Sequence, residues 1–161
     1  MPKKNFYITT PIYYPSAKPH MGHAYSSIIA DFFARFKRLD EFDVMFLTGT
    51  DEHGQKIEKA AKKNNLDPKV FCDQISETFR DLTTLLNLSN NDFIRTTEQR
   101  HKISVQNLWR KLYDSGNIYL SSYKGWYSIS DEAFYNEDEI IKNESGEHIS
   151  NQSGSRVEWV E

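Results

Sequence analysis

The sequence is poor in cysteine and has no long apolar run. Its 161 residues include one cysteine, Cys72, which excludes an internal disulfide and a zinc site built from several thiolates. No apolar stretch approaches the roughly 20 residues that a transmembrane helix needs. Lys3 and Lys4 are not followed by the apolar segment of a secretory signal. These absences favour a soluble, cytoplasmic protein without membrane contacts, in which Cys72 is a half-buried filler.

An excess of charge of one sign is also missing. With 20 Lys and Arg against 23 Asp and Glu, the formal net charge is −3, which gives no sign of a dominant nucleic-acid-binding face. Aromatic residues are abundant, with ten Phe, nine Tyr and three Trp, and they indicate a folded chain. The length suits one domain, alone or with a smaller insertion.

The first 50 residues have the pattern of a strand, a helix and a second strand. Residues 6–10 alternate as a β-strand does, and residues 43–48 form a short apolar run that fits a strand buried on both faces of a parallel sheet. Between them, residues 22–39 predict an amphipathic helix. Its apolar stripe consists of Ile28, Ile29, Phe32, Phe33, Phe36 and Leu39. Such a right-handed unit begins many nucleotide-binding α/β folds.

The turn before this helix carries the pattern H-x-G-H, formed by His20, Gly22 and His23. The first N–H groups of a helix and its dipole favour an anion, and Gly22 lets a ligand approach the backbone closely. Both histidines could donate a ring N–H to phosphate oxygens. A metal-binding pair and ordinary surface histidines are the alternatives, of which the metal pair lacks further ligands nearby.

A second polar loop, residues 49–54, follows the second strand. Parallel strands end at one edge of their sheet, so this loop and the H-x-G-H turn are expected at the same edge, where α/β folds bind ligands. Asp51 lies in this loop. On its own, Asp51 is most simply a helix N-cap or a solvated loop residue.

The rest of the chain predicts more helices and then a region with a period of two. Residues 55–64 continue as a short helix, and Asp67 with Pro68 begins a longer one. Residues 93–95 are a brief strand, after which Thr96 or Thr97 caps a further helix that ends at Gly116. The inward residues expected on that last helix are Val105, Leu108, Trp109 and Leu112.

From residue 118 the pattern is that of antiparallel strands. Lys124 and Gly125 are expected to form a turn between two of them. Residues 143–156 read as a polar loop or weak hairpin, and residues 156–161 as a strand.

Taken together, these blocks resemble the class I aminoacyl-tRNA synthetases, and within them the methionyl-tRNA synthetase family. The resemblance rests on residues 8–23 (ITTPIYYPSAKPHMGH), 46–57 (FLTGTDEHGQKI), 125–134 (GWYSISDEAF) and 157–161 (VEWVE). It implies an α/β fold, with the first half of a Rossmann-like class I catalytic domain in residues 1–117. Residues 118–161 would then be part of a β-rich connective-peptide insertion.

The resemblance also implies an activity and roles for site residues. The full enzyme, a methionine-tRNA ligase, would use ATP with Mg²⁺ to convert methionine to methionyl-adenylate, and would then transfer methionine to its tRNA. His20 and His23 would be catalytic and would bind ATP phosphates. Thr10 and Gly22 would also belong to the ATP site, where Gly22 would leave room for adenine. Methionine would be bound by the Asp51 carboxylate, by the backbone carbonyl of Ile12 and by Tyr14.

Two departures from the family pattern shape further expectations. Where many members carry zinc-binding cysteine pairs, this chain has Ser128 and Asp131, so no structural zinc is expected. The second catalytic signature of the family, a K-M-S-K-S loop, is not among these residues, so the 161-residue chain alone is expected to be inactive, and contacts to tRNA are expected mainly outside it. Two alternatives remain: another class I synthetase or H-x-G-H nucleotidyl-transferase, and a non-catalytic module that binds a nucleotide or a partner.

Overall fold

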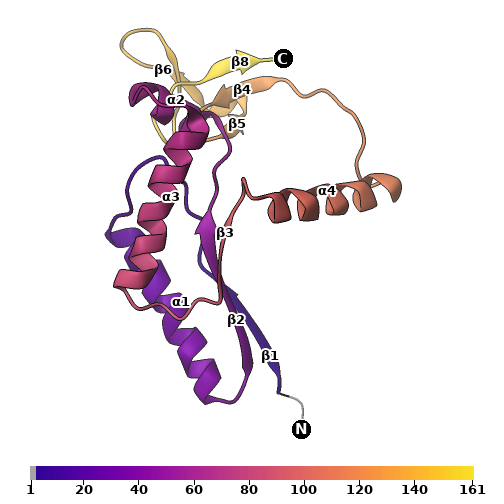
Figure 1. Ribbon diagram of the computed structural model, residues 1–161. Helices are drawn as coiled ribbons and strands as arrows, with labels where there is room; N and C mark the ends of the chain where they lie inside the picture. The colour runs from indigo at the N-terminus through magenta and orange to yellow at the C-terminus, as the bar shows by residue number, and fades with distance from the viewer. Residues whose placement is uncertain (1–2) are drawn as a thin grey trace. The chain divides into compact units, whose positions relative to one another are not determined.

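The computed structural model describes residues 3–161 of the chain (Figure 1). It divides into two compact units, one up to Leu108 and one from Trp109 to Glu161, and each is described by itself. The expected division between residues 117 and 118 stays a prediction. None of the helices in residues 3–161 has both the length and the apolar character that crossing a lipid bilayer requires.

The first unit is built on a parallel three-stranded sheet with the order β1-β2-β3. The strands are β1 (Asn5–Thr9), β2 (Asp43–Thr50) and β3 (Asp92–Arg95). The helices are α1 (Met21–Leu39), α2 (Gln55–Lys63) and α3 (Pro68–Leu85), and α4 (Gln99–Asp114) begins in this unit and continues past Leu108. Helix α1 connects β1 to β2, so the predicted strand–helix–strand unit is confirmed, and the other predicted helices and strands of this unit lie within a few residues of their expected bounds.

The ends of the helices follow local sequence signals. Asp67 caps α3, since its carboxylate accepts hydrogen bonds from the N–H groups of Lys69 and Val70, as predicted. Gly116, two residues after the end of α4 at Asp114, has a φ of +75° and terminates the helix, as predicted. The N–H of Gly116 donates to Tyr113 O and the next N–H to Leu112 O, which satisfies the last carbonyls of the helix.

Helix α1 packs on the sheet through small side chains. Its buried residues are Ala24, Ser27, Ala30, Asp31 and Ala34. Ala30 and Ala34 form a core with Val44 and Phe46 of β2. The predicted apolar stripe is therefore not the face that packs on the sheet, because its six members are 40–85% exposed. Small residues let the helix backbone approach the strands closely. The spacing of the large apolar residues does not show that the face with the small residues is the one that packs on the sheet.

One face of the sheet is covered much more than the other. Figure 1 shows α1 and α3 on the same side of the strands. In the first half of β2, Val44 and Phe46 point to that side and are buried, whereas Met45 is 41% exposed. The expectation of burial on both faces is wrong for this half of the strand, because α1 and α3 cover one face only.

Helix α4 differs from its prediction in two ways. It begins at Gln99, and the hydroxyls of Thr96 and Thr97 make hydrogen bonds with Glu52, so neither residue caps the helix as expected. No residue of α4 is buried. The four apolar residues that were expected to face a core are 39–60% exposed.

The second unit consists of short antiparallel strands. One sheet has the order β5-β4-β8, and β6 pairs with β7. The elements are β4 (Gly125–Ser128), β5 (Ala133–Tyr135), η1 (Glu137–Glu139), β6 (Ile140–Lys142), β7 (His148–Ser150) and β8 (Glu158–Val160). The antiparallel pattern is confirmed from Gly125 onward, as are the weak hairpin and the last strand, but residues 118–124 form no strand, contrary to the prediction. The turn expected at Lys124 and Gly125 is wrong, because Gly125 pairs with Val160 and the chain reverses at residues 129–132.

Candidate functional site

The carboxyl edge of the sheet brings the two predicted loops together. After β1 the chain continues alongside the end of β2, where Tyr13 bridges to Thr50 in a parallel sense. The N–H of Tyr13 donates to Gly49 O at 3.1 Å, and the N–H of Asp51 donates to Tyr13 O at 2.8 Å. The H-x-G-H turn and the Asp51 loop are therefore joined by backbone hydrogen bonds, as their common edge predicts.

His20 and His23 cap the N-terminus of α1 for each other. Nδ1 of His20 accepts from the N–H of Gly22 at 3.0 Å, and Nδ1 of His23 accepts from the N–H of His20 at 3.0 Å. This is the reciprocal arrangement of a capping box, with imidazoles in place of the usual hydroxyl and carboxylate. Two of the N–H groups that have no partner within the helix are satisfied in this way.

These hydrogen bonds determine how both rings are protonated. A ring nitrogen that accepts a hydrogen bond carries no proton, so each neutral ring must hold its proton on Nε2. The ring centroids of His20 and His23 lie 3.9 Å apart, so the two rings sit together beside the positive end of the helix dipole. The arrangement can offer two Nε2–H donors to an anion.

Aromatic neighbours hold the ring of His23 in place. The centroid of Tyr13 lies 4.8 Å away and that of Phe79 lies 5.0 Å away, both with the rings edge to face. Tyr13 is itself fixed by hydrogen bonds from its hydroxyl to Ser26 and Ser27. Burial, and then the proximity of His20, lower the pKa of His23. His23 is thereby biased toward the neutral form that the capping box requires.

Gly22 makes room for the capping histidine. A Cβ at this position would lie 2.8 Å from Cε1 of His20, closer than real Cβ atoms come to such a neighbour. The sequence predicts that Gly22 leaves space for a ligand. The contact shows that it leaves space for the His20 ring, which any larger residue would displace from its N-cap position.

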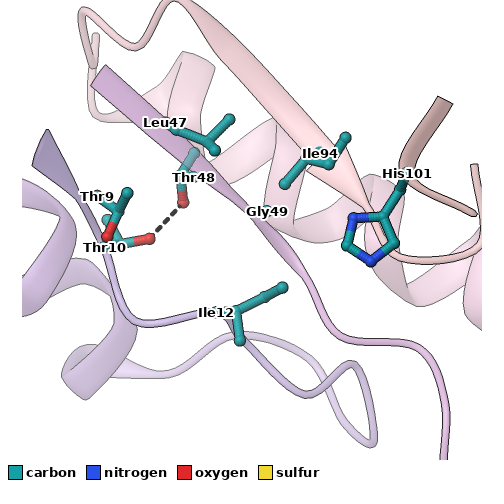
Figure 2. Close-up of a pocket in the computed structure, with 8 residues that line it drawn as sticks. All are labelled: Thr9, Thr10, Ile12, Leu47, Thr48, Gly49, Ile94 and His101. Atoms are coloured by element: carbon teal, nitrogen blue, oxygen red, sulfur yellow. Dashed lines mark hydrogen bonds between the residues drawn. The ribbon is translucent and has the colours of Figure 1, made fainter. Parts of the chain in front are cut away.

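Two cavities open at this edge, and Ile12 lines both of them. One has a volume of about 260 Å³, and it is lined by Ile12, Tyr13, Tyr14, Ser16, Ala17, Lys18, His20 and His23. The other has a volume of about 400 Å³ and appears in Figure 2. Its lining consists of Thr9, Thr10, Ile12, Leu47, Thr48, Gly49, Ile94 and His101. Five predicted site residues thus line a cavity, whereas Gly22 and Asp51 line neither.

The larger cavity has an apolar floor and a pair of hydroxyls. Oγ of Thr10 and Oγ of Thr48 lie 2.7 Å apart and are hydrogen-bonded, as Figure 2 shows. Gly49 is part of this floor. The position requires glycine because a Cβ there would lie 1.9 Å from the carbonyl oxygen of Ile94. His101 was not predicted as a site residue. Its place in the first turn of a helix that leaves the same sheet edge is the signal that could have revealed it.

Asp51 is half-buried and lies close to the residues that follow β3. The hydroxyl of Thr96 donates to its Oδ1 at 3.4 Å. The alternative role as a helix N-cap is wrong, because α2 begins after Gly54. Tyr14, the other predicted methionine contact, is 41% exposed, and Nζ of Lys56 lies 5.4 Å from the centroid of its ring.

The neighbour of Asp51, Glu52, is a site residue that the sequence did not reveal. Its side chain is fully buried and forms a double hydrogen-bonded ion pair with Arg95, with distances of 2.6 and 2.9 Å. Burial raises the pKa of a carboxyl, but hydrogen bonds from Arg95, Thr97 and Thr50 outweigh it, so the pKa of Glu52 lies below its usual value. The register of β2 and β3, which pairs Thr50 with Arg95, is the signal that could have indicated this ion pair.

The residues at the family's zinc position form a hydrogen-bonded cluster. Asp131 accepts from the hydroxyls of Tyr135, Ser153 and Ser155 at 2.6–2.9 Å, and its N–H donates to Ser128. Serine hydroxyls are not the donors that structural zinc selects. Within residues 3–161, no group of three or more His, Cys, Asp or Glu side chains could hold a metal ion. The residues present do not fit zinc, and its absence from the protein in solution stays a prediction.

A parallel sheet with paired histidines at the first helix N-terminus, facing cavities at the carboxyl edge, defines an α/β nucleotide-binding domain of the class I synthetase type. The model of the family described as tRNA synthetases class I (M) matches residues 6–159. The chain belongs to this family.

Individual relatives agree with the family match. The chain is 56% identical over 155 residues to the methionine–tRNA ligase of Rickettsia conorii, and the match covers 96% of this chain and 30% of that protein. It is 51% identical over 168 residues to the Bacillus subtilis ligase, covering 99% and 25%. A Mycobacterium tuberculosis methionyl-tRNA synthetase solved in complex with methionyl-adenylate superposes with a TM-score of 0.91 at 44% identity, covering 98% of this chain and 31% of that chain. This chain thus spans about 30% of the length of such relatives.

Proposed function

We propose that the chain forms the first half of the catalytic domain of a methionine–tRNA ligase. In this reaction ATP, bound with Mg²⁺, and methionine give methionyl-adenylate and pyrophosphate, and the methionyl group then passes to its tRNA in the cytoplasm. The observation that carries the proposal is the histidine capping box, which holds two Nε2–H donors at a helix N-terminus beside two cavities. The relative solved with methionyl-adenylate, at 44% identity, supports the same reaction.

On the ATP side, His20 and His23 bind phosphate oxygens and favour the charge distribution of the transition state. Because capping fixes both rings before a ligand arrives, their donors need little reorganisation during the reaction. Thr10, beside Thr48, contributes to the ATP site from the larger cavity. Gly22 contributes by keeping the His20 ring over the helix N-terminus.

On the methionine side, the roles belong to Ile12, Tyr14 and Asp51. Ile12 stands between the two cavities and offers its backbone carbonyl to the α-ammonium group. Asp51 supplies the opposite charge, and the backbone hydrogen bond from its N–H to Tyr13 keeps it at the turn. Tyr14 lines the cavity that it shares with the histidines.

The test is single-turnover adenylation by the complete synthetase, with methionine and ATP titrated separately. Asp51→Ala removes the partner of a charge already present in free methionine, so we expect methionine binding to weaken by about 2–5 kcal/mol. His23→Ala instead lowers the rate constant by roughly 10²–10³, with a much smaller change in methionine affinity. A His23→Ala enzyme with a normal rate constant and weak methionine binding would refute the proposed division of roles between His23 and Asp51.

The alternative is a non-catalytic module that binds a nucleotide or a partner at the same sheet edge. Both candidate functions give the same expectation for a protein that consists of residues 1–161 alone. These residues are expected to give no methionine-dependent ATP–pyrophosphate exchange above that of buffer. They differ for the complete polypeptide, which exchanges pyrophosphate only if the proposed function is right.

A further inference from the structure

The carboxylate of Glu52 is the most completely buried charged group at the sheet edge. Its side chain has no exposed surface, and each of its two oxygens accepts two hydrogen bonds. Oε1 accepts from Arg95 Nε at 2.6 Å and from Thr50 at 2.8 Å, and Oε2 accepts from Arg95 Nη2 at 2.9 Å and from Thr97 at 2.5 Å. A buried carboxylate is tolerated when it is paired and its lone pairs are satisfied, and all of these conditions are met here.

These hydrogen bonds hold the loop in which Asp51 lies. The N–H of Glu52 donates to the hydroxyl of Thr96 at 2.8 Å, and the same hydroxyl reaches Oδ1 of Asp51 at 3.4 Å. Thr96, which follows β3, is thus hydrogen-bonded to both Asp51 and Glu52, which follow β2. Arg95 is held in turn by Asp73 at 2.5 Å.

Glu52 itself cannot reach a ligand. Its side chain has no exposed surface, and its neighbours use both of its oxygens. Asp51 is the half-buried member of the pair, and the one hydrogen bond described for its carboxylate comes from Thr96 at 3.4 Å. Of these two adjacent carboxylates, that of Glu52 is therefore used within the protein interior, and that of Asp51 is the one that could bind a cation.

We propose that Glu52 and Arg95 are positioning residues that aim the Asp51 carboxylate at the α-ammonium group of the amino-acid substrate. The inference rests on the proposed function, since it requires methionine as a ligand of Asp51. It goes beyond that function because it gives a role in methionine binding to an ion pair that does not itself contact the substrate. Bidentate pairing fixes the orientation of both groups, which a single hydrogen bond does not.

The test is equilibrium binding of two probes to the complete synthetase. Methionine carries the α-ammonium group, and 4-(methylthio)butanoate is the same molecule without it. In the unaltered enzyme we expect methionine to bind at least about 30-fold more tightly, the factor that corresponds to a desolvated charge pair. Asp51→Ala should abolish this difference.

Glu52→Gln keeps the size of the side chain and removes its charge. If Asp51 is then no longer held in position, the ratio of the two affinities should fall by roughly 10-fold, while binding of the probe that lacks the ammonium group stays as it was. Arg95→Lys keeps the charge but loses the bidentate geometry, and it should act in the same direction. It also serves as the measurement if Glu52→Gln does not fold.

Asp31→Asn is the matched control. Asp31 is likewise a buried carboxylate that accepts from an arginine, Arg35, and from the N–H and hydroxyl of Ser89, but it lies outside the site. This variant should leave the difference between the two probes unchanged.

The outcomes separate the inference from the function on which it rests. An unchanged difference in both Glu52→Gln and Arg95→Lys, or equal weakening of both probes, would overturn the positioning role while leaving the function intact. If the unaltered enzyme did not bind methionine, the proposed function would itself fail.

Discussion

The histidine capping box makes two contributions that one pair of substitutions can separate. Nδ1 of His20 caps α1, and the opposite nitrogen, Nε2, is the donor proposed for phosphate. Asparagine places its carboxamide oxygen close to the position of Nδ1 and is itself a favoured N-cap residue. His20→Asn should therefore keep the cap and lose the donor, whereas His20→Ala should lose both.

The expected magnitudes follow from these contacts. Loss of an N-cap acceptor costs about 0.5–2 kcal/mol, so His20→Ala should lower the free energy of unfolding by that amount and His20→Asn by much less. Loss of one preorganised donor to the transition state lowers a rate constant by roughly 10²–10³, so both variants should adenylate methionine more slowly by that factor.

The assays are urea denaturation and single-turnover adenylation, both on the complete synthetase carrying each substitution. Equal destabilisation by asparagine and alanine would show that Nδ1 does not cap the helix. A His20→Asn enzyme with an undiminished rate constant would show that Nε2 is not the phosphate donor. Either result would refute the tautomer that the hydrogen bonds of the capping box imply.

Three further predictions concern stability. Because the pKa of His23 is lowered, the unfolded chain takes up a proton there before the folded chain does, so stability present above about pH 6.5 is lost below it. Urea denaturation above and below this pH should show a smaller loss for His23→Asn than for the unaltered protein, and equal losses would contradict the argument. Asp131, whose pKa is lowered to about 2 by hydrogen bonds from Ser153, Tyr135 and other hydroxyl groups, should be needed for thermal stability. Asp131→Ala should lower the unfolding temperature more than Asp138→Ala, and metal analysis of the unaltered protein should find no zinc, whereas one zinc per chain would contradict the hydrogen-bonded cluster. Gly49→Ala should cost roughly 1–3 kcal/mol in the free energy of unfolding, because its Cβ would meet the carbonyl oxygen of Ile94. Gly125→Ala is its control, since the nearest atom there lies at an ordinary 3.5 Å, and equal costs would argue against the close approach.

Local patterns in the sequence were sufficient for much of the fold. The alternation of residues 6–10, the helical spacing that follows and the Asp67 cap each act within a few residues. Parallel strands end at one edge, so the meeting of the H-x-G-H turn with the Asp51 loop could also be predicted without coordinates. Five of the predicted site residues line the cavities at that edge.

The features that the sequence did not predict depend on partners far along the chain. Thr96 and Thr97 have the right residue type for an N-cap, but their hydroxyls bond to Glu52, more than 40 positions earlier. Helix α1 likewise packs on β2 through alanines, which allow close approach of the two backbones, and its larger apolar residues are exposed. In each case a tertiary contact overrides a local preference, as is usual for weak propensities.

The same contrast between local pattern and tertiary contact applies to the two carboxylates of the edge loop. Asp51 and Glu52 are adjacent acidic residues, and nothing in their local pattern says which one is buried. Pairing of β2 with β3 places Arg95 opposite Thr50, and the long glutamate side chain reaches the guanidinium while the aspartate stays toward the turn. One ion pair thus assigns an interior role to Glu52 and leaves Asp51 as the carboxylate that a cationic ligand can meet. Strand register determines which carboxylate is buried, so the proposal of Asp51 as the binding carboxylate depends on the sheet as much as on the loop.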